Sequence, residues 1–257
     1  MTQNDRIVYQ FPISHYCEKT RWNLDAKGLS YRIHDLFPGF HRIRLRRLTG
    51  GLTTVPVLDD RGVIVADSAA IAIHLEREYP DRPLLPADEA ARARARELEA
   101  YFDETAGRYA RQWAYSEFIT ERRGGAAAAF FAGYSPSTRL LGKALAPLLE
   151  FVLNKEYTIG PQSIDSARNN VLEALDRLER ETSGDPDRYL VGDKLSIADI
   201  SAASLLGPVI GPPGSPWSED ISSPMPVPPS VRDLRAELRS RPGGAWVLAR
   251  YGRDRHR

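Results

Sequence analysis

The sequence holds a single cysteine, Cys17, among its 257 residues. One thiol excludes an internal disulfide framework and a zinc site built from several cysteines. A chain with so little cysteine also fits a reducing compartment. Any special role for sulfur must therefore involve Cys17 or a thiol that comes from outside the chain.

Long apolar runs and an excess of one charge are missing as well. No stretch reaches bilayer-spanning length, and the opening lacks the basic start and apolar core of a signal peptide. Lys and Arg number 35 against 34 Asp and Glu, so no strong field favours nucleic acid or an anionic membrane. With 42% hydrophobic residues, the chain is expected to be a globular, cytoplasmic protein without nucleic-acid or membrane partners.

The first third alternates strand-like and helical patterns. Residues 7–11 and 31–36 are rich in β-forming side chains, and residues 15–27 between them have apolar positions at helical spacing. Gly28 follows, where the end of a helix favours a residue that can adopt positive φ. This order predicts a βαβ unit.

Two more strands are expected at residues 55–58 and 63–65. The sequence Asp-Asp-Arg-Gly between them, residues 59–62, has the composition of a hairpin turn. Asp67 or Ser68 then offers a side-chain cap for a helix with apolar residues at helical spacing. The first 80 residues therefore predict a small sheet covered by helices.

The remainder of the chain shows no convincing strand alternation. Residues 79–88 contain three prolines and indicate a linker between a domain of residues 1–80 and an all-helical domain of residues 89–257. Two stripes of apolar residues predict core-facing helices in the second domain. The stripes are Leu98, Phe102, Ala106, Tyr109 and Trp113, and Ile164, Ala167, Val171, Leu175 and Leu178. Residues 124–133 are rich in alanine and glycine, so the sequence does not predict where a helix begins or ends there.

Local signals organise the last third of the chain. Ser196 and Asp199 can form a capping box, which predicts a buried helix that starts at Ser196. Eight prolines lie between Pro208 and Pro229, and they predict an irregular crossing segment or lid instead of a helix. One amphipathic helix over residues 231–250 is expected to close the chain.

Residues 14–17, Ser-His-Tyr-Cys, stand where the first strand leads into the first helix. Backbone N–H groups and the helix dipole favour an anion such as a thiolate there. Thioredoxin-like folds carry Cys-x-x-Cys at this place, and here Ser14 replaces the first cysteine. A serine hydroxyl can donate a hydrogen bond to a bound thiolate and lower its pKa. The alternative is that Ser14 only caps the helix.

Two other short motifs each allow two interpretations. A cis bond before Pro56 would turn the backbone of Val55 outward, whereas a trans bond would mark an ordinary edge strand. Asp67 and Ser68 offer a carboxylate and a hydroxyl for the ammonium and carboxylate of an amino-acid head group. Otherwise this pair is simply a helix cap.

In their order and spacing, these motifs resemble the glutathione S-transferase superfamily, and within it the serine-type, bacterial-like members. The resemblance rests on residues 14–22 (SHYCEKTRW), Val55-Pro56-Val57, Asp67-Ser68 and residues 196–199 (SIAD). It is strong over residues 6–80 and weak from Gly207 onward. It implies an α/β thioredoxin-like N-terminal domain that binds glutathione and an all-α C-terminal helical domain that contributes the site for an electrophile.

The resemblance also implies roles for single residues. Ser14 is the implied catalytic residue, through a hydrogen bond to the glutathione sulfur. Val55 would pair its backbone with the cysteinyl part beside a cis Pro56, and Asp67 with Ser68 would hold the γ-glutamyl head. The residues implied to bind glutathione are His41, Thr54, Val55, Pro56, Asp67 and Ser68. No metal is implied.

Several assignments stay open in the sequence. His41 is implied to bind the glycine carboxylate, with Arg44 as the alternative, but residues 41–47 can equally form a solvated basic face. His15 stands where many relatives have proline. Cys17 is expected to pack in the interior, although a thiol one helical turn from the sulfur site could also serve disulfide exchange.

The implied activity is that of a glutathione S-transferase, in which the glutathione thiolate attacks a small electrophilic substrate. The electrophile would sit in an apolar cleft near Tyr109 and Trp113, unless these side chains belong to the core. A cytoplasmic homodimer that serves detoxification is the family expectation. The alternatives are a glutathione-dependent isomerase, a thiol-disulfide reductase, and a glutathione-fold binding protein without turnover.

Overall fold

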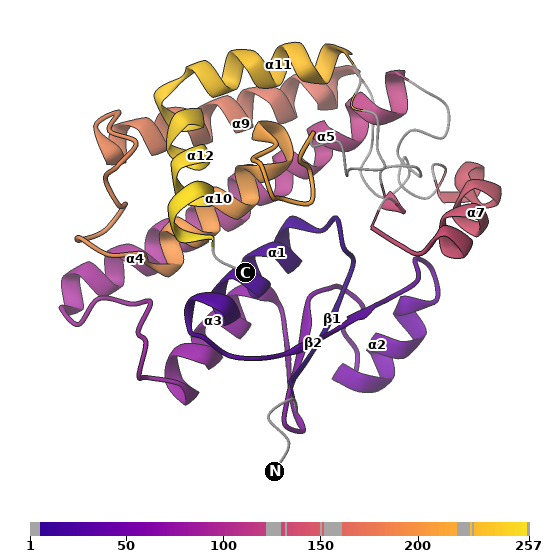
Figure 1. The fold of residues 1–257 in the computed structure, drawn as a ribbon, viewed down its shortest axis with the longest axis horizontal. Helices are drawn as coiled ribbons and strands as arrows, with labels where there is room; N and C mark the ends of the chain where they lie inside the picture. The colour runs from indigo at the N-terminus through magenta and orange to yellow at the C-terminus, as the bar shows by residue number, and fades with distance from the viewer. Residues whose placement is uncertain are drawn as a thin grey trace.

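The computed structural model describes residues 6–121, 130, 131, 133–149, 151, 161–219, 227 and 229–255. A mixed four-stranded sheet with its helices forms the N-terminal part, and only helices and turns follow it in the described residues (Figure 1). The helical domain is stacked on the α/β domain, and helix α1 packs against helix α10. This confirms the expected fold class.

The N-terminal domain has the predicted βαβ and ββα order. Its strands are arranged β2-β1-β3-β4, with β1 parallel to β2 and antiparallel to β3. Arg61 and Gly62, at φ 58° and 93°, form the predicted hairpin turn between β3 and β4, because both central residues of such a turn need positive φ. The elements are β1 (Arg6–Gln10), α1 (His15–Ala26), β2 (Arg32–Asp35), α2 (His41–Thr49), β3 (Val57–Asp60), β4 (Val63–Ala66) and α3 (Ser68–Glu78).

Neighbouring residues of β1 point to opposite faces of the sheet. Val8 packs with Leu24 of α1 and with Ile71 of α3, whereas Tyr9 packs with Leu45 of α2. This alternation follows from the two-residue period of a strand. Helices α1 and α3 therefore cover one face and α2 covers the other.

The helical domain is built around α10, in which every residue is buried. Asp199 accepts hydrogen bonds from the N–H groups of Ser196 and Leu190, each at 2.8 Å, which confirms the predicted capping box. Burial raises the pKa of Asp199 to about 6. The elements are α4 (Glu89–Phe102), η1 (Asp103–Gly107), α5 (Arg108–Glu121), α7 (Pro136–Ala144), α9 (Pro161–Thr182), α10 (Ile197–Ile210), α11 (Pro229–Ser240) and α12 (Pro242–Asp254).

The two predicted apolar stripes lie on core-facing helices, but the first is not one continuous α-helix. The π-helix η1 separates α4 from α5 between Phe102 and Tyr109. Most stripe residues belong to the main core, and Tyr109 and Ile164 are the half-buried ones. Among the residues that the structure describes, no helix is long and apolar enough to span a membrane.

The prediction of irregular structure from Pro208 onward is wrong at its start. Pro208 lies inside α10, because the packing of this fully buried helix outweighs the backbone hydrogen bond that proline removes. Residues 211–219 then form turns without a helix, as expected. Residues 220–226 and 228 of the proline-rich segment lie outside the described residues, as do most of residues 124–133.

The prediction of a single last helix over residues 231–250 is also wrong. Helix α11 ends at Ser240 and α12 begins at Pro242. The proline ring cannot continue the α11 hydrogen-bond ladder, but it fits the first turn of a new helix. Gly244 lets α12 turn back closely, since a Cβ there would lie 1.9 Å from the carbonyl oxygen of Leu238.

Buried ion pairs attach α1 to the helical domain. The Lys19 ammonium is fully buried and pairs with the carboxylates of Glu99 and Asp103. Arg255, which directly follows α12, pairs with Glu18 of α1 at 2.8 Å and with Asp25 of α1 at 2.6 Å. These contacts hold the helix that follows the candidate sulfur site against α4 and the C-terminal end of α12.

We expect Lys19→Met to lower the free energy of unfolding by about 3 kcal/mol, because it leaves two carboxylates near the interior without their cation. Urea denaturation would measure this change. Arg77→Ala is the control, since Arg77 and Glu78 form an exposed pair that contributes at most about 1 kcal/mol. Equal stability losses in the two variants would contradict the assignment.

Candidate functional site

Ser14 is the N-cap of α1, in the turn that follows β1. Its N–H donates to the carbonyl oxygen of Phe11 at 3.0 Å, and its Oγ accepts from the N–H of Cys17 at 3.4 Å. Oγ acts as the acceptor in this long capping bond, and its hydroxyl also interacts with the thiol of Cys17. The side chain is half-buried. Helix capping and thiolate binding are therefore compatible roles for Ser14.

The peptide bond between Val55 and Pro56 is cis, as the resemblance implied. Tyr9 pairs with Val57 in the antiparallel ladder of β1 and β3. Beyond this pair, Val55 and Phe11 both pack against the cluster that contains Tyr9 and Val57, at the end of β1 that leads into the Ser14 turn.

Asp67 caps α3 from an unusual backbone conformation, with φ 82° and ψ 134°. Its Oδ1 accepts hydrogen bonds from the N–H groups of Ala69 at 2.9 Å and Ala70 at 3.1 Å. Positive φ is rare for a residue with a side chain, and such strain clusters at ligand and active sites. The Asp67 N–H also donates to the carbonyl oxygen of Pro56 at 3.3 Å. This bond joins the Asp67 motif to the cis-proline motif.

Ser68 is only 1% exposed, and its Oγ has no hydrogen-bond partner within the described part of the chain. A buried hydroxyl without a partner is uncommon and costs roughly 1–3 kcal/mol. Its neighbour Asp67 is exposed. A carboxylate and an unsatisfied hydroxyl thus lie together at the start of α3, which suits a polar ligand group.

His41, the first residue of α2, lies close to the Ser14 turn. Its ring packs against Phe11 with the ring centroids 4.8 Å apart, and its Nδ1 accepts from the N–H of Gly39 at 3.0 Å. Arg44, the alternative to His41, instead lies over the ring of Tyr9, 5.4 Å from its centroid. Arg44 lines a pocket of about 500 Å³ with Tyr9, Phe40, Ile43, Arg47 and Leu48.

The predicted site residues therefore gather at one end of the sheet. The Ser14 turn, the Val55–Pro56 bond and Asp67 with Ser68 are joined by the β1–β3 register and by the Asp67–Pro56 hydrogen bond. Thr54 is exposed next to Val55, and no hydrogen bond ties it to the other site residues in the described ranges.

Cys17 lies one helical turn after Ser14 and is fully buried. Burial raises the pKa of its thiol, with Arg21 opposing the effect. A buried thiol with a raised pKa is a poor nucleophile.

Sequence reasoning left three contacts of the Ser14 turn unassigned. Trp217 Nε1 donates to the carbonyl oxygen of Ile13 at 3.1 Å, just before Ser14. His15 Nε2 lies 2.7 Å from the carbonyl oxygen of Gly107, and the Tyr16 hydroxyl donates to the carbonyl oxygen of Asp103 at 3.0 Å. Since each bond joins the turn to a residue far along the chain, and each acceptor is a backbone carbonyl, no residue pattern could indicate them.

The imidazole of His15 is buried and neutral. Burial, followed by the charge of Arg111, lowers its pKa to about 3. Its Nε2 faces a carbonyl oxygen, which can only accept, so Nε2 carries the proton and donates it to Gly107.

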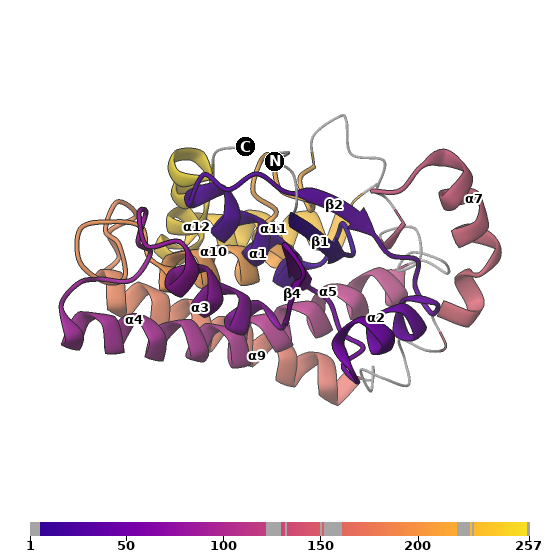
Figure 2. The same ribbon diagram turned by 90° about the horizontal axis from the view of Figure 1, so that it is seen from below.

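Aromatic side chains close the site on its α2 side. Phe130 packs against Phe11 with ring centroids 4.9 Å apart, and Phe131 against Phe37 at 5.4 Å. In Figure 2, as in Figure 1, helices α2 and α7 lie at the same end of the molecule. Trp113 is 2% exposed within the main core, so of the two expected cleft residues only Tyr109 is half-buried.

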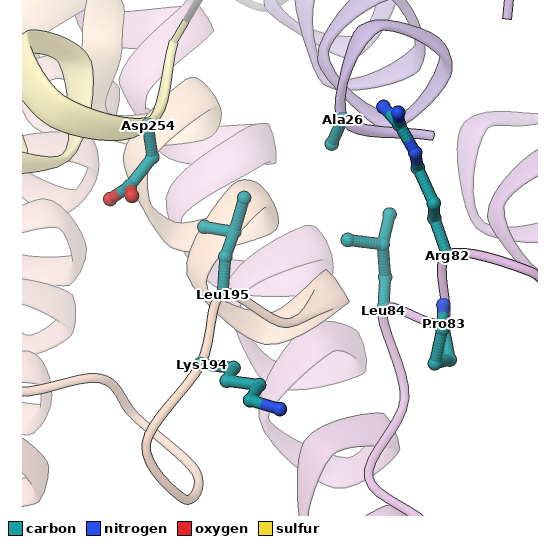
Figure 3. A pocket seen from close by; sticks show the side chains of 7 residues that line it. All are labelled: Ala26, Arg82, Pro83, Leu84, Lys194, Leu195 and Asp254. Carbon is teal, nitrogen blue, oxygen red and sulfur yellow. The ribbon is translucent and has the colours of Figure 1, made fainter. Parts of the chain in front are cut away.

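A second pocket, of about 280 Å³, lies at the junction of the two domains and contains none of the predicted site residues. Figure 3 shows Arg82 and Ala26 on one side of it, with Asp254 and Leu195 across from them. Pro83, Leu84 and Lys194 complete its lining. In the described ranges there is no group of three or more His, Cys, Asp and Glu side chains placed to hold a metal ion.

Family models match both domains. Residues 8–83 match the glutathione S-transferase N-terminal domain, and residues 161–233 match the glutathione S-transferase C-terminal domain. A solved glutathione S-transferase of Ceriporiopsis subvermispora, in complex with glutathione, has the same fold: its TM-score is 0.58 at 18% identity, over 96% of this chain and 95% of that one.

Two curated relatives extend the comparison. Glutathione S-transferase 1 of Dianthus caryophyllus is 39% identical over 88 residues, which cover 34% of this chain and only 40% of that relative. A probable maleylacetoacetate isomerase of Caenorhabditis elegans is 26% identical over 208 residues, or 80% of this chain and 79% of that protein.

The matches to both family models, together with the geometry at the end of the sheet, show that this chain belongs to the glutathione S-transferase superfamily.

Proposed function

We propose that the protein is a serine-type glutathione S-transferase that conjugates the glutathione thiolate to a small electrophilic substrate. The observation that carries the proposal is the position of Ser14: its half-buried hydroxyl lies at the start of α1, and Asp67 with Ser68 lie at the same end of the sheet. Glutathione complexes of structural neighbours support this choice of thiol.

In this proposal each part of glutathione meets a different motif. The γ-glutamyl ammonium and carboxylate bind Asp67 and Ser68, and the buried Ser68 hydroxyl gains the partner that it lacks in the described residues. The cysteinyl backbone pairs with Val55, between Thr54 and the cis Pro56. His41 binds the glycine carboxylate. The domain of residues 1–80 then holds glutathione, and the domain of residues 89–257 supplies the electrophile site.

The chemistry follows from the charge at sulfur. A hydrogen bond from Ser14 Oγ favours the thiolate over the thiol, and each unit of pKa lowering is worth about 1.4 kcal/mol. The thiolate then forms a carbon–sulfur bond with the electrophile, whose leaving group departs with the electron pair or whose adjacent carbon takes up a proton. The protein contributes thiolate stabilisation and proximity. The proposal includes a cytoplasmic homodimer that serves detoxification.

Glutathione-dependent isomerisation is the second candidate. It is favoured by the similarity to a probable maleylacetoacetate isomerase, which covers 80% of this chain. Both reactions would use the same thiolate, so Ser14 serves either one. Thiol-disulfide exchange is disfavoured by the complete burial of Cys17. A binding protein without turnover would need the glutathione-binding residues but not the Ser14 hydroxyl.

We expect Ser14→Ala to reduce conjugation of glutathione to a chromogenic electrophile by about 10- to 100-fold, because the thiolate loses its hydrogen-bond donor. Initial rates over a range of pH would show this loss and a rise in the apparent pKa of the thiol. Ser135→Ala is the matched control, since Ser135 caps α7 and accepts from the Thr138 N–H at 3.3 Å. Unchanged rates in Ser14→Ala would remove Ser14 from the mechanism.

We expect Asp67→Asn to weaken glutathione binding by about 1.5–3 kcal/mol, because the amide keeps a capping oxygen but loses the charge that pairs with the γ-glutamyl ammonium. Calorimetric titration would give the two dissociation constants. Asp88→Asn removes the same charge from another helix cap, where Asp88 accepts from Ala91 at 2.8 Å. Equal affinity in wild type and Asp67→Asn would contradict the assignment.

A parallel assay separates the two candidate reactions. The protein is given glutathione with a panel of electrophiles, and separately with maleylacetoacetate. Because conjugation consumes glutathione and isomerisation regenerates it, we expect glutathione to be consumed in proportion to product. Turnover of maleylacetoacetate with no loss of glutathione, together with no conjugation to any electrophile, would contradict the transferase proposal and support isomerase activity.

A further inference from the structure

The turn that carries Ser14 is attached to the helical domain on both of its sides. Trp217 binds the backbone of Ile13, which precedes Ser14, and His15, which follows it, binds the backbone of Gly107. Trp217 comes from the segment after α10, and Gly107 ends the π-helix η1. Two separate parts of the helical domain therefore form hydrogen bonds with the residue before Ser14 and with the residue after it.

Beside each of these hydrogen bonds lies a glycine at which a Cβ would collide with a neighbouring side chain. A Cβ on Gly107 would lie 2.5 Å from the Tyr16 hydroxyl oxygen, and a Cβ on Gly207 would lie 2.4 Å from the ring of Trp217. Distances this short force a neighbour to move. The two glycines thus let η1 and α10 come close enough for the side chains next to Ser14 to be held.

The π-helix η1 supplies two of the acceptors that hold the start of α1. A single π turn shifts the backbone hydrogen-bond register and is frequent at functional sites. Here the first residue of η1, Asp103, accepts from Tyr16, and the last, Gly107, accepts from His15. Consecutive residues of α1 therefore bind the two ends of η1.

We propose that His15 and Trp217 are positioning residues that set the direction of the Ser14 hydroxyl, so that the helical domain controls thiolate formation in the other domain. The inference rests on the proposed function. Neither residue touches the reacting sulfur in this account; each acts through the backbone of the Ser14 turn. A hydrogen bond weakens steeply with angle, so a small rotation of this turn lowers thiolate stabilisation before it lowers binding.

Attachment of the domains alone does not require these bonds. The ion pairs of Lys19 and Arg255 and the packing of α1 on α10 already join the domains farther along α1. A proline in place of His15, which the resemblance implies for many relatives, could not donate this bond to Gly107.

The test is the pKa of the thiol of bound glutathione, followed by the ultraviolet absorbance of the thiolate against pH. We expect His15→Phe and Trp217→Phe, which keep a ring but lose the N–H donor, each to raise this pKa by about one unit, a tenfold loss of thiolate at low pH. His15→Gln retains a donor and should recover most of the effect. Gly207→Ala should act like Trp217→Phe, because it displaces the indole.

Affinity for S-methylglutathione, which has no thiol to ionise, should stay within about twofold of wild type in these variants. His74→Phe is the matched control. His74 is also buried, and its Nε2 lies 2.8 Å from the carboxylate of Asp60, so its hydrogen bond does not involve the Ser14 turn. It should lower the Tm without moving the thiol pKa.

Each outcome decides something different. If the wild type shows no thiolate and binds neither ligand, the proposed function falls, and this inference with it. If the wild type shows a thiolate but His15→Phe and Trp217→Phe only lower the Tm, as His74→Phe does, the positioning role is overturned. Should His15→Phe not fold, Trp217→Phe and Gly207→Ala decide the question on their own.

Discussion

The proposed function depends on one constraint, the direction of the Ser14 hydroxyl group. A serine is a weak acid and a weak base, so it can favour a thiolate only by pointing its proton at the sulfur from a fixed position. That position is defined by a short turn between β1 and α1. Beside Ser14, the carbonyl of Ile13 accepts from the indole of Trp217 and the ring of His15 bonds the carbonyl of Gly107. The ion pairs of Lys19 and Arg255 hold the helix that follows. The two domains therefore meet at the turn that carries Ser14, the proposed catalytic residue.

Local sequence signals predicted much of the fold. The sequence predicted the hairpin at Arg61 and Gly62 and the helix start at Ser196, because each depends on residues close in the chain. The failures have the opposite cause. Pro208 stays helical because α10 is buried on all sides, and the π-helix η1 interrupts a stripe whose apolar spacing is that of an ordinary helix. Tertiary packing determines the backbone conformation at both places, and the local residue pattern carries no information about that packing.

The residues of the candidate site also fall into two groups, those that local motifs predict and those that only the tertiary structure reveals. Ser14, Pro56, Asp67 and Ser68 were chosen from motifs, and the structure brings these motifs to one end of the sheet. The sequence marks His15 only as a departure from the family pattern, and no motif marks Trp217. Their partners are backbone carbonyls, which every residue has, so composition and spacing could not reveal them. The proline-rich segment, where the resemblance is weakest, is thus the one that reaches back to the residue before Ser14.

A crystal structure of the protein with bound glutathione would test the central claim most directly. The account predicts the sulfur within hydrogen-bonding distance of Ser14 Oγ, with the bonds from Trp217 to Ile13 and from His15 to Gly107 intact. A glutathione sulfur bound away from Ser14, with its hydroxyl engaged only in the helix cap, would contradict it.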